Sequence, residues 1–115
     1  MDTRLLEPNV LHVFLPSEPQ LQPELALLRE QVAHMAQTHL VLDLSRVEII
    51  TSASIGSLLL MQKQLARQGR RLVLCCAHLA TACIFQVAGL DKLLEFAKNE
   101  SEALAVVRTP SPSPA

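Results

Sequence analysis

The sequence predicts a single α/β domain with a mixed, mostly parallel sheet of about four or five strands, crossover helices and an N-terminal β-hairpin. Two observations predict this fold class. Short apolar runs alternate with amphipathic segments from residue 40 onward, and two apolar runs near the N-terminus flank a turn-like Pro-Asn pair. A length of 115 residues, 50% of them hydrophobic, suits one domain with one core. With Phe as the only aromatic residue type, that core must be largely aliphatic.

The first predicted elements are the hairpin and a helix. Leu5–Glu7 and Val10–Leu15 have the composition of strands. Prolines mark residues 16–23 as a loop, and Pro23 suits the first turn of a helix. Helical spacing of apolar residues then predicts an amphipathic helix over residues 23–37. The residues with this spacing are Leu25, Leu28, Val32 and Met35.

The rest of the chain alternates between strands and helices. Apolar runs bounded by polar residues predict buried strands at Leu40–Leu44, Arg71–Cys76 and Leu93–Phe96. Helices are predicted at about Ser54–Gln68, at 79–88 and at Glu100–Val107. Gly69 and Gly89 mark helix ends, and Asn99 or Ser101 caps the last helix. We therefore expect the domain to span residues 1–108, followed by a disordered Pro/Ser tail over residues 109–115.

Composition argues against several classes of protein. A net charge of −1 without a basic block is atypical of nucleic-acid binding. No apolar run approaches the ~20 residues that span a bilayer, so we expect no direct membrane insertion. The N-terminus, Met-Asp-Thr-Arg, lacks the form of a secretory signal. An odd number of cysteines in apolar surroundings suits reduced thiols, and we expect a cytoplasmic protein.

The cysteines and histidines do not predict a metal site. Cys75, Cys76, His78 and Cys83 are not spaced like the usual Cys-x2-Cys ligand pairs. Cys75 and Cys76 are adjacent at a strand end, so their side chains should point to opposite faces. We expect buried thiols, no metal and no cofactor. The remaining histidines are expected at the surface or at a sheet edge: His12, His34 and His39. No nucleophile, base and orienting group come together, so we expect no enzyme.

The turn from Thr51 to Gly56 is the candidate functional segment. Its hydroxyl groups precede a helix, where unpaired N–H groups and the helix dipole favour negative charge. Ser52 is either a helix cap or a phosphoacceptor. Asp43, at the end of a strand, is expected to cap the next turn, with a contribution to an interface as the alternative. We expect the following residues to contact a partner: Thr51, Ser52, Ala53, Ser54, Ile55, Ser57 and Met61.

The order of these features resembles the STAS domain family of anti-sigma factor antagonists. The resemblance covers about residues 5–108. It rests on the strand followed by Asp43-Leu44-Ser45-Arg46-Val47, the small-residue turn, Gly69-Arg70-Arg71-Leu72-Val73-Leu74, Gly89-Leu90-Asp91-Lys92-Leu93-Leu94 and the closing helix at Ala103. The family's usual turn is Asp-Ser-Ser/Thr-Gly-Leu-Gly. Ser52 occupies the phosphoacceptor position and Gly56 matches the second glycine, whereas Thr51, Ala53 and Ser54 depart from the pattern.

The resemblance implies a non-enzymatic signalling module in transcription regulation. Such a domain binds a histidine-kinase-like anti-sigma factor, an ATPase, and frees a sigma factor; phosphorylation of the serine releases the partner. This partner switching would make the chain a phosphoprotein at Ser52. The alternative is a STAS-domain scaffold that docks on a transporter ATPase without phosphorylation. No feature of the sequence specifies an oligomeric state.

Overall fold

The computed structural model describes residues 2–35 and 38–108 and contains a five-stranded sheet in the order β1-β2-β3-β4-β5. The strands are β1 (Asp2–Glu7), β2 (Val10–Phe14), β3 (His39–Asp43), β4 (Leu72–Cys75) and β5 (Glu95–Ala97). The helices are α1 (Leu21–Ala33), α2 (Ser52–Ala66), α3 (Leu79–Val87), the 3-10 helix η1 (Leu90–Lys92) and α4 (Glu100–Arg108). Because β1 is antiparallel to β2 and all other pairs are parallel, the predicted α/β fold with an N-terminal hairpin is confirmed.

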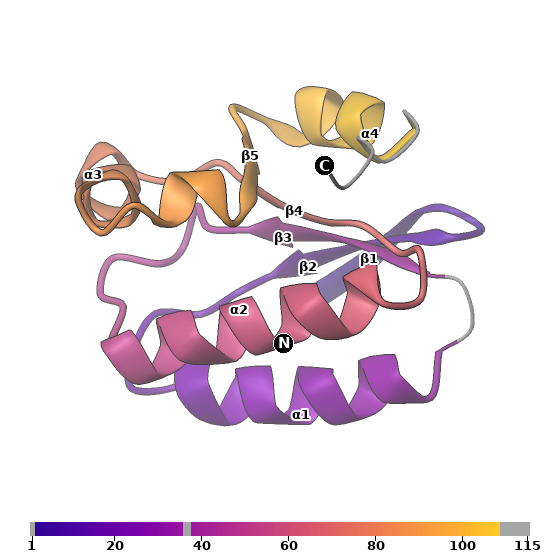
Figure 1. Ribbon diagram of the computed structural model, residues 1–115, viewed down its shortest axis with the longest axis horizontal. Helices are drawn as coiled ribbons and strands as arrows, with labels where there is room; N and C mark the ends of the chain where they lie inside the picture. Colours follow the sequence, from indigo (N-terminus) through magenta and orange to yellow (C-terminus); the bar gives the residue numbers. More distant parts are fainter. Residues whose placement is uncertain (1, 36–37, 109–115) are drawn as a thin grey trace.

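Alternation along the central strands divides the core between the two faces of the sheet. Leu40 and Leu42 of β3 pack with the buried residues of α1 and α2, whereas Val41 packs with Ala103 and Val107 of α4. Figure 1 shows the same layering, with α1 and α2 on one side of the sheet and α4 on the other. The beginning of α2 and helix α3 lie at the same end of the molecule (Figure 1). In the described part of the chain, no helix is long and apolar enough to cross a membrane.

Local sequence signals set most of the element boundaries. Gly69 and Gly89 adopt left-handed φ angles of 70° and 75° and follow α2 and α3, as predicted. Asn99 caps α4, because its Oδ1 accepts the Glu102 N–H at 2.9 Å. Helix α1 ends at Ala33, earlier than predicted, and positions 36–37 lie outside the described residues, as does the predicted tail at 109–115.

Two boundaries differ from the prediction for identifiable reasons. Helix α2 begins at Ser52 rather than near Ser54, because Thr51 caps it: Thr51 Oγ1 accepts the Ser54 N–H at 3.2 Å. Strand β5 begins at Glu95 rather than Leu93, because Leu93 closes η1: its backbone N–H donates to the Leu90 oxygen at 3.0 Å. The first shift comes from a side-chain cap and the second from a backbone hydrogen bond, and the apolar pattern reports neither.

Candidate functional site

The N-terminus of α2 is built around the carboxylate of Glu18, which comes from the loop before α1. Glu18 Oε2 accepts hydrogen bonds from Thr51 N at 3.1 Å, Thr51 Oγ1 at 2.7 Å and Ser54 Oγ at 2.5 Å. Its other oxygen, Oε1, accepts the Gln22 N–H at 3.2 Å. A carboxylate therefore lies where the dipole of α2 favours negative charge.

These contacts keep Glu18 ionised. Burial by itself would raise the pKa of the Glu18 carboxyl, but hydrogen bonds from Ser54 and Thr51 outweigh it and lower the pKa below its usual value. The hydroxyl of Ser54 is fully buried and is directed at Glu18. Thr51 and Ser54, two of the positions that depart from the family turn, are thus the residues that hold this carboxylate.

Ser52 is the first residue of α2, and its side chain is exposed. Within residues 2–35 and 38–108, its hydroxyl forms no hydrogen bond. The capping role considered for Ser52 is wrong, since Thr51 is the cap. The Ser52 hydroxyl is consequently open to solvent, and its backbone lies in the first turn of a helix.

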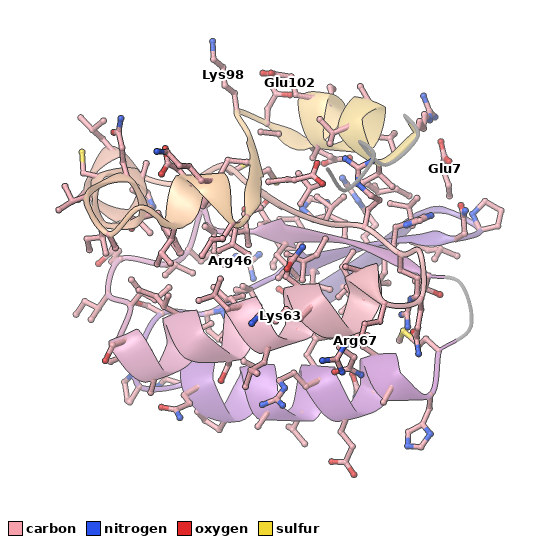
Figure 2. All side chains as sticks on the ribbon, in the orientation of Figure 1. Glu7, Arg46, Lys63, Arg67, Lys98 and Glu102 are labelled. Carbon is pink, nitrogen blue, oxygen red and sulfur yellow. The ribbon has the colours of Figure 1, made fainter. Side chains whose placement is uncertain are left out.

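A shallow groove of about 440 Å³ runs along the outer side of α2, next to this turn. Its lining residues recur at helical spacing: Ala53, Gly56, Ser57, Leu59, Leu60 and Lys63. Leu60 is 53% exposed, and Lys63 and Arg67 lie on the exposed side of the helix (Figure 2). Ala53 and Ser57 were predicted to contact a partner, whereas Gly56, Leu60 and Lys63 were not. Helical spacing counted from Ala53 places these three residues on the same side of α2, so the sequence pattern could have identified them.

Three of the predicted partner contacts lie partly or wholly inside the fold. Ser54 and Met61 are fully buried, and Ile55 is partly buried against the core between the sheet, α1 and α2. The expected exposure of Met61 is wrong, because Ser54, Leu58, Met61 and Leu65 form the inward face of α2. Neither Ser54 nor Met61 is available to a partner of the folded domain.

A second polar cluster lies on the opposite face of the sheet, under α4. His12 Nε2 is 2.9 Å from Asp43 Oδ2, and Cys75 completes a buried group whose N, O and S atoms all lie within 4.8 Å of one another. Asp43 Oδ1 accepts the Ser45 N–H at 2.8 Å, which confirms its predicted role in the turn. The expected surface position of His12 is wrong: its exposed fraction is 1%, because α4 packs over this face.

The two adjacent cysteines lie on the same side of the sheet. The backbone of Cys76 adopts a φ of 61°, so the alternation of side chains between the two faces of β4 ends there. The Sγ of Cys76 lies 3.6 Å from Cys75 Sγ. The prediction of opposite faces is therefore wrong. Burial raises the pKa of the Cys75 thiol and, to a smaller extent, that of Cys76. The expectation of a buried thiol is wrong for Cys83, which is exposed on α3, and His78 bonds the backbone oxygen of Ser45, so neither residue joins this cluster.

The sequence of this chain is similar to known proteins. A family model described as "Mlab, STAS domain" matches residues 20–95. The putative anti-sigma factor antagonist BtrV of Bordetella bronchiseptica is 31% identical over 93 residues, which cover 81% of this chain and 77% of that protein.

Solved structures support the fold. The crystal structure of a putative anti-sigma factor antagonist from Thermotoga maritima has a TM-score of 0.77 at 19% identity, covering 94% of both chains. The phosphorylated form of the Bacillus cell fate determinant SpoIIAA has a TM-score of 0.61 at 19% identity, covering 93% of this chain and 98% of that one. Fold and sequence agree: this chain belongs to the STAS domain family.

Proposed function

We propose that this domain is a regulatory binding module that antagonises an anti-sigma factor, and that phosphorylation of Ser52 releases the partner. The observation that carries the proposal is an exposed serine hydroxyl without a hydrogen-bond partner among the described residues, beside an open groove on the same helix. The 31% identity to a putative anti-sigma factor antagonist supports the same role. The partner would be a histidine-kinase-like ATPase, which transfers the γ-phosphate of ATP to Ser52 Oγ.

The groove on α2 suits close approach by another protein. Ala53, Gly56 and Ser57 have small side chains, so a partner can pack near the helix backbone, and Leu60 adds apolar area at the same surface. A phosphate on Ser52 adds about −1.5 to −2 charges at the edge of this surface. Burying that charge under a partner costs several kcal/mol of desolvation free energy. The first turn of α2 stabilises it by only about 0.3–1 kcal/mol. Phosphorylation would therefore weaken the complex while the domain stays folded.

Phosphomimetic variants test this mechanism against a matched control. Ser52→Asp adds a negative charge at the first turn of α2, and Ser57→Asp adds the same charge in the groove, five residues further along the helix. Ser52→Ala removes the acceptor hydroxyl without adding charge. We expect mass spectrometry after incubation with the cognate kinase and ATP to find phosphate on Ser52 and none in Ser52→Ala. Ser52→Asp should weaken kinase binding, whereas Ser52→Ala should keep it. Phosphate confined to another residue, or unchanged binding of Ser52→Asp, would refute the switch; loss of binding in Ser57→Asp would support the groove as the contact surface.

The contacts of Glu18 favour a second candidate function, a scaffold that docks on a transporter ATPase without phosphorylation. The N-terminus of α2 already holds one carboxylate, bonded to Thr51 and Ser54, so a second anion beside it would be repelled. Under this reading, affinity capture should recover a transporter ATPase, and Ser52→Ala should have no effect on function in the cell. Recovery of a kinase together with a sigma factor would exclude the scaffold.

A further inference from the structure

We propose that His12, Asp43, Cys75 and Cys76 form a zinc site on the face of the sheet that α4 covers. The ligand atoms come from three neighbouring strands and the residue that follows the last of them. In the sheet register Phe14 pairs with Asp43 and Asp43 pairs with Cys75, and His12 lies two residues before Phe14. The side chains of His12, Asp43 and Cys75 therefore project from the same face of the sheet.

The separations between the ligand atoms suit a tetrahedral ion. Zinc bonds of 2.0–2.3 Å imply ligand–ligand distances of roughly 3.3–3.8 Å. His12 Nε2 and Asp43 Oδ2 are 2.9 Å apart, and one ring nitrogen of His12, one carboxylate oxygen of Asp43 and Cys75 Sγ all lie within 4.8 Å of one another. Cys76 Sγ is 3.6 Å from Cys75 Sγ and lies outside this group of three. Side-chain adjustments of about 1 Å would thus place a metal between His12, Asp43 and Cys75, and rotation of the Cys76 side chain toward them would supply the fourth ligand. The left-handed backbone of Cys76 is what turns the second thiol toward the first.

The second ring nitrogen of His12 faces Glu100, outside the cluster, and can orient the histidine as a ligand. When Nε2 of His12 pairs with Asp43, Nδ1 is left without a hydrogen bond among the described residues, although His12 is almost fully buried. Glu100 Oε2 lies 3.4 Å from that Nδ1, and Arg4 holds Glu100 by an ion pair. Metal on Nε2 places the histidine proton on Nδ1, where a small movement lets it donate to Glu100. This is the carboxylate–histidine–metal arrangement that orients histidine ligands in zinc proteins.

The donor set selects zinc over the harder cations. Two sulfur atoms, one imidazole and one carboxylate suit Zn²⁺, whereas Mg²⁺ and Ca²⁺ take oxygen ligands. On coordination each thiol releases its proton to solvent, and the metal charge replaces it. Cys76 is only partly buried, so an ion can reach the cluster from its side. The site lies on the other side of the sheet from the groove on α2, and the zinc proposal is independent of the proposed function.

Metal titration of the full chain tests the site. Protein stripped with a chelator and kept reduced is titrated with Zn²⁺ alone, and with Co²⁺ as a spectroscopic probe. We expect one zinc per chain, and with cobalt the intense visible bands of a tetrahedral site together with sulfur-to-metal charge transfer. Glu100→Gln should weaken zinc binding by about 10–100-fold, as for other outer carboxylate partners. Cys83→Ser, which removes the exposed thiol outside the cluster, should leave zinc binding unchanged.

The variant Cys76→Gly separates loss of a ligand from loss of the fold. Glycine adopts the left-handed φ of 61° without strain, so this variant should unfold at a temperature no lower than the parent in the presence of chelator. It should nevertheless bind zinc more than tenfold more weakly and lose part of the charge-transfer band. Zinc binding as tight as that of the parent would overturn the proposal. So would absence of stoichiometric binding in the parent, or loss of binding in Cys83→Ser.

Discussion

Replacing Glu18 with alanine removes the carboxylate that accepts three hydrogen bonds through Oε2 at the start of α2. Thr51 and Ser54, which donate these hydrogen bonds, are affected differently by the loss of the acceptor. Thr51 is exposed, so water can replace Glu18 as the acceptor for its N–H and hydroxyl. Ser54 is fully buried, and its hydroxyl keeps only the contact with Thr51 Oγ1 at 3.3 Å. Most of the cost of the substitution therefore falls on Ser54.

The expected loss of stability is about 2 kcal/mol. A buried hydroxyl that loses a charged acceptor accounts for about 1–2 kcal/mol. Loss of the negative charge from the positive end of α2 adds about 0.5 kcal/mol, because Glu18 is partly exposed and the dipole interaction is screened by solvent. For a domain of this size, 2 kcal/mol lowers the unfolding temperature by roughly 8–10 °C.

Urea unfolding at neutral pH measures this difference, with Glu48→Ala as the matched control. Glu48 is an exposed acid near the same end of α2, and its side chain forms no hydrogen bond with the described residues. The control should stay within about 0.5 kcal/mol of the parent.

The pH dependence gives a second readout. Because the pKa of Glu18 is lowered in the folded state, its contribution is present above its unfolded pKa and is lost as pH falls through the folded one. The stability difference between parent and Glu18→Ala should therefore shrink below about pH 4. Equal stability at neutral pH, or a difference that grows in acid, would refute the assigned role.

Two further substitutions probe the fold around α2. Gly56→Ala should raise the free energy of unfolding by about 0.5–1 kcal/mol, since a Cβ there meets no atom within 4 Å; a lower unfolding temperature would contradict this. Arg70 is buried and donates to the backbone oxygens of Val32 at 3.1 Å and Thr38 at 2.8 Å. Arg70→Met should therefore cost about 2 kcal/mol in denaturant unfolding, and an unchanged midpoint would show that these bonds are dispensable.

The sequence predicts the parts of the fold that depend on neighbouring residues. Pro23, Gly69, Gly89 and Asn99 act within one helical turn, and each lies where the prediction placed it. Met61 shows the limit of such signals. It ends a run of four apolar residues on α2, so periodicity does not decide which of them face the core. The inward face is set by packing of α2 against α1 and the sheet, which local sequence does not contain.

The candidate sites depend even more on distant contacts. Glu18 lies in a proline-containing loop and pairs with Thr51 and Ser54, which are far along the chain, so no local pattern predicts its place at α2. His12 meets Asp43 only because β2 and β3 are parallel neighbours in a particular register. Cysteine spacing alone therefore could not reveal that His12 and Asp43 lie beside Cys75.

The Thr51–Gly56 turn departs from the family pattern, and the position of Glu18 bears on what those departures do. The family pattern has aspartate where this chain has Thr51, and that difference by itself removes a negative charge from the start of α2. In the structure, the carboxylate of Glu18 supplies a negative charge at this position, and the hydroxyl groups of Thr51 and Ser54 donate hydrogen bonds to it. A phosphate on Ser52 would be repelled by this carboxylate: at an assumed separation of about 6 Å, two unit charges repel by roughly 0.7 kcal/mol in water and about 2.8 kcal/mol at an effective dielectric constant of about 20, and a doubly charged phosphate doubles either value. Glu18 therefore makes phosphorylation of Ser52 more costly, whereas the desolvation cost at a packed interface acts on the phosphate once it has formed.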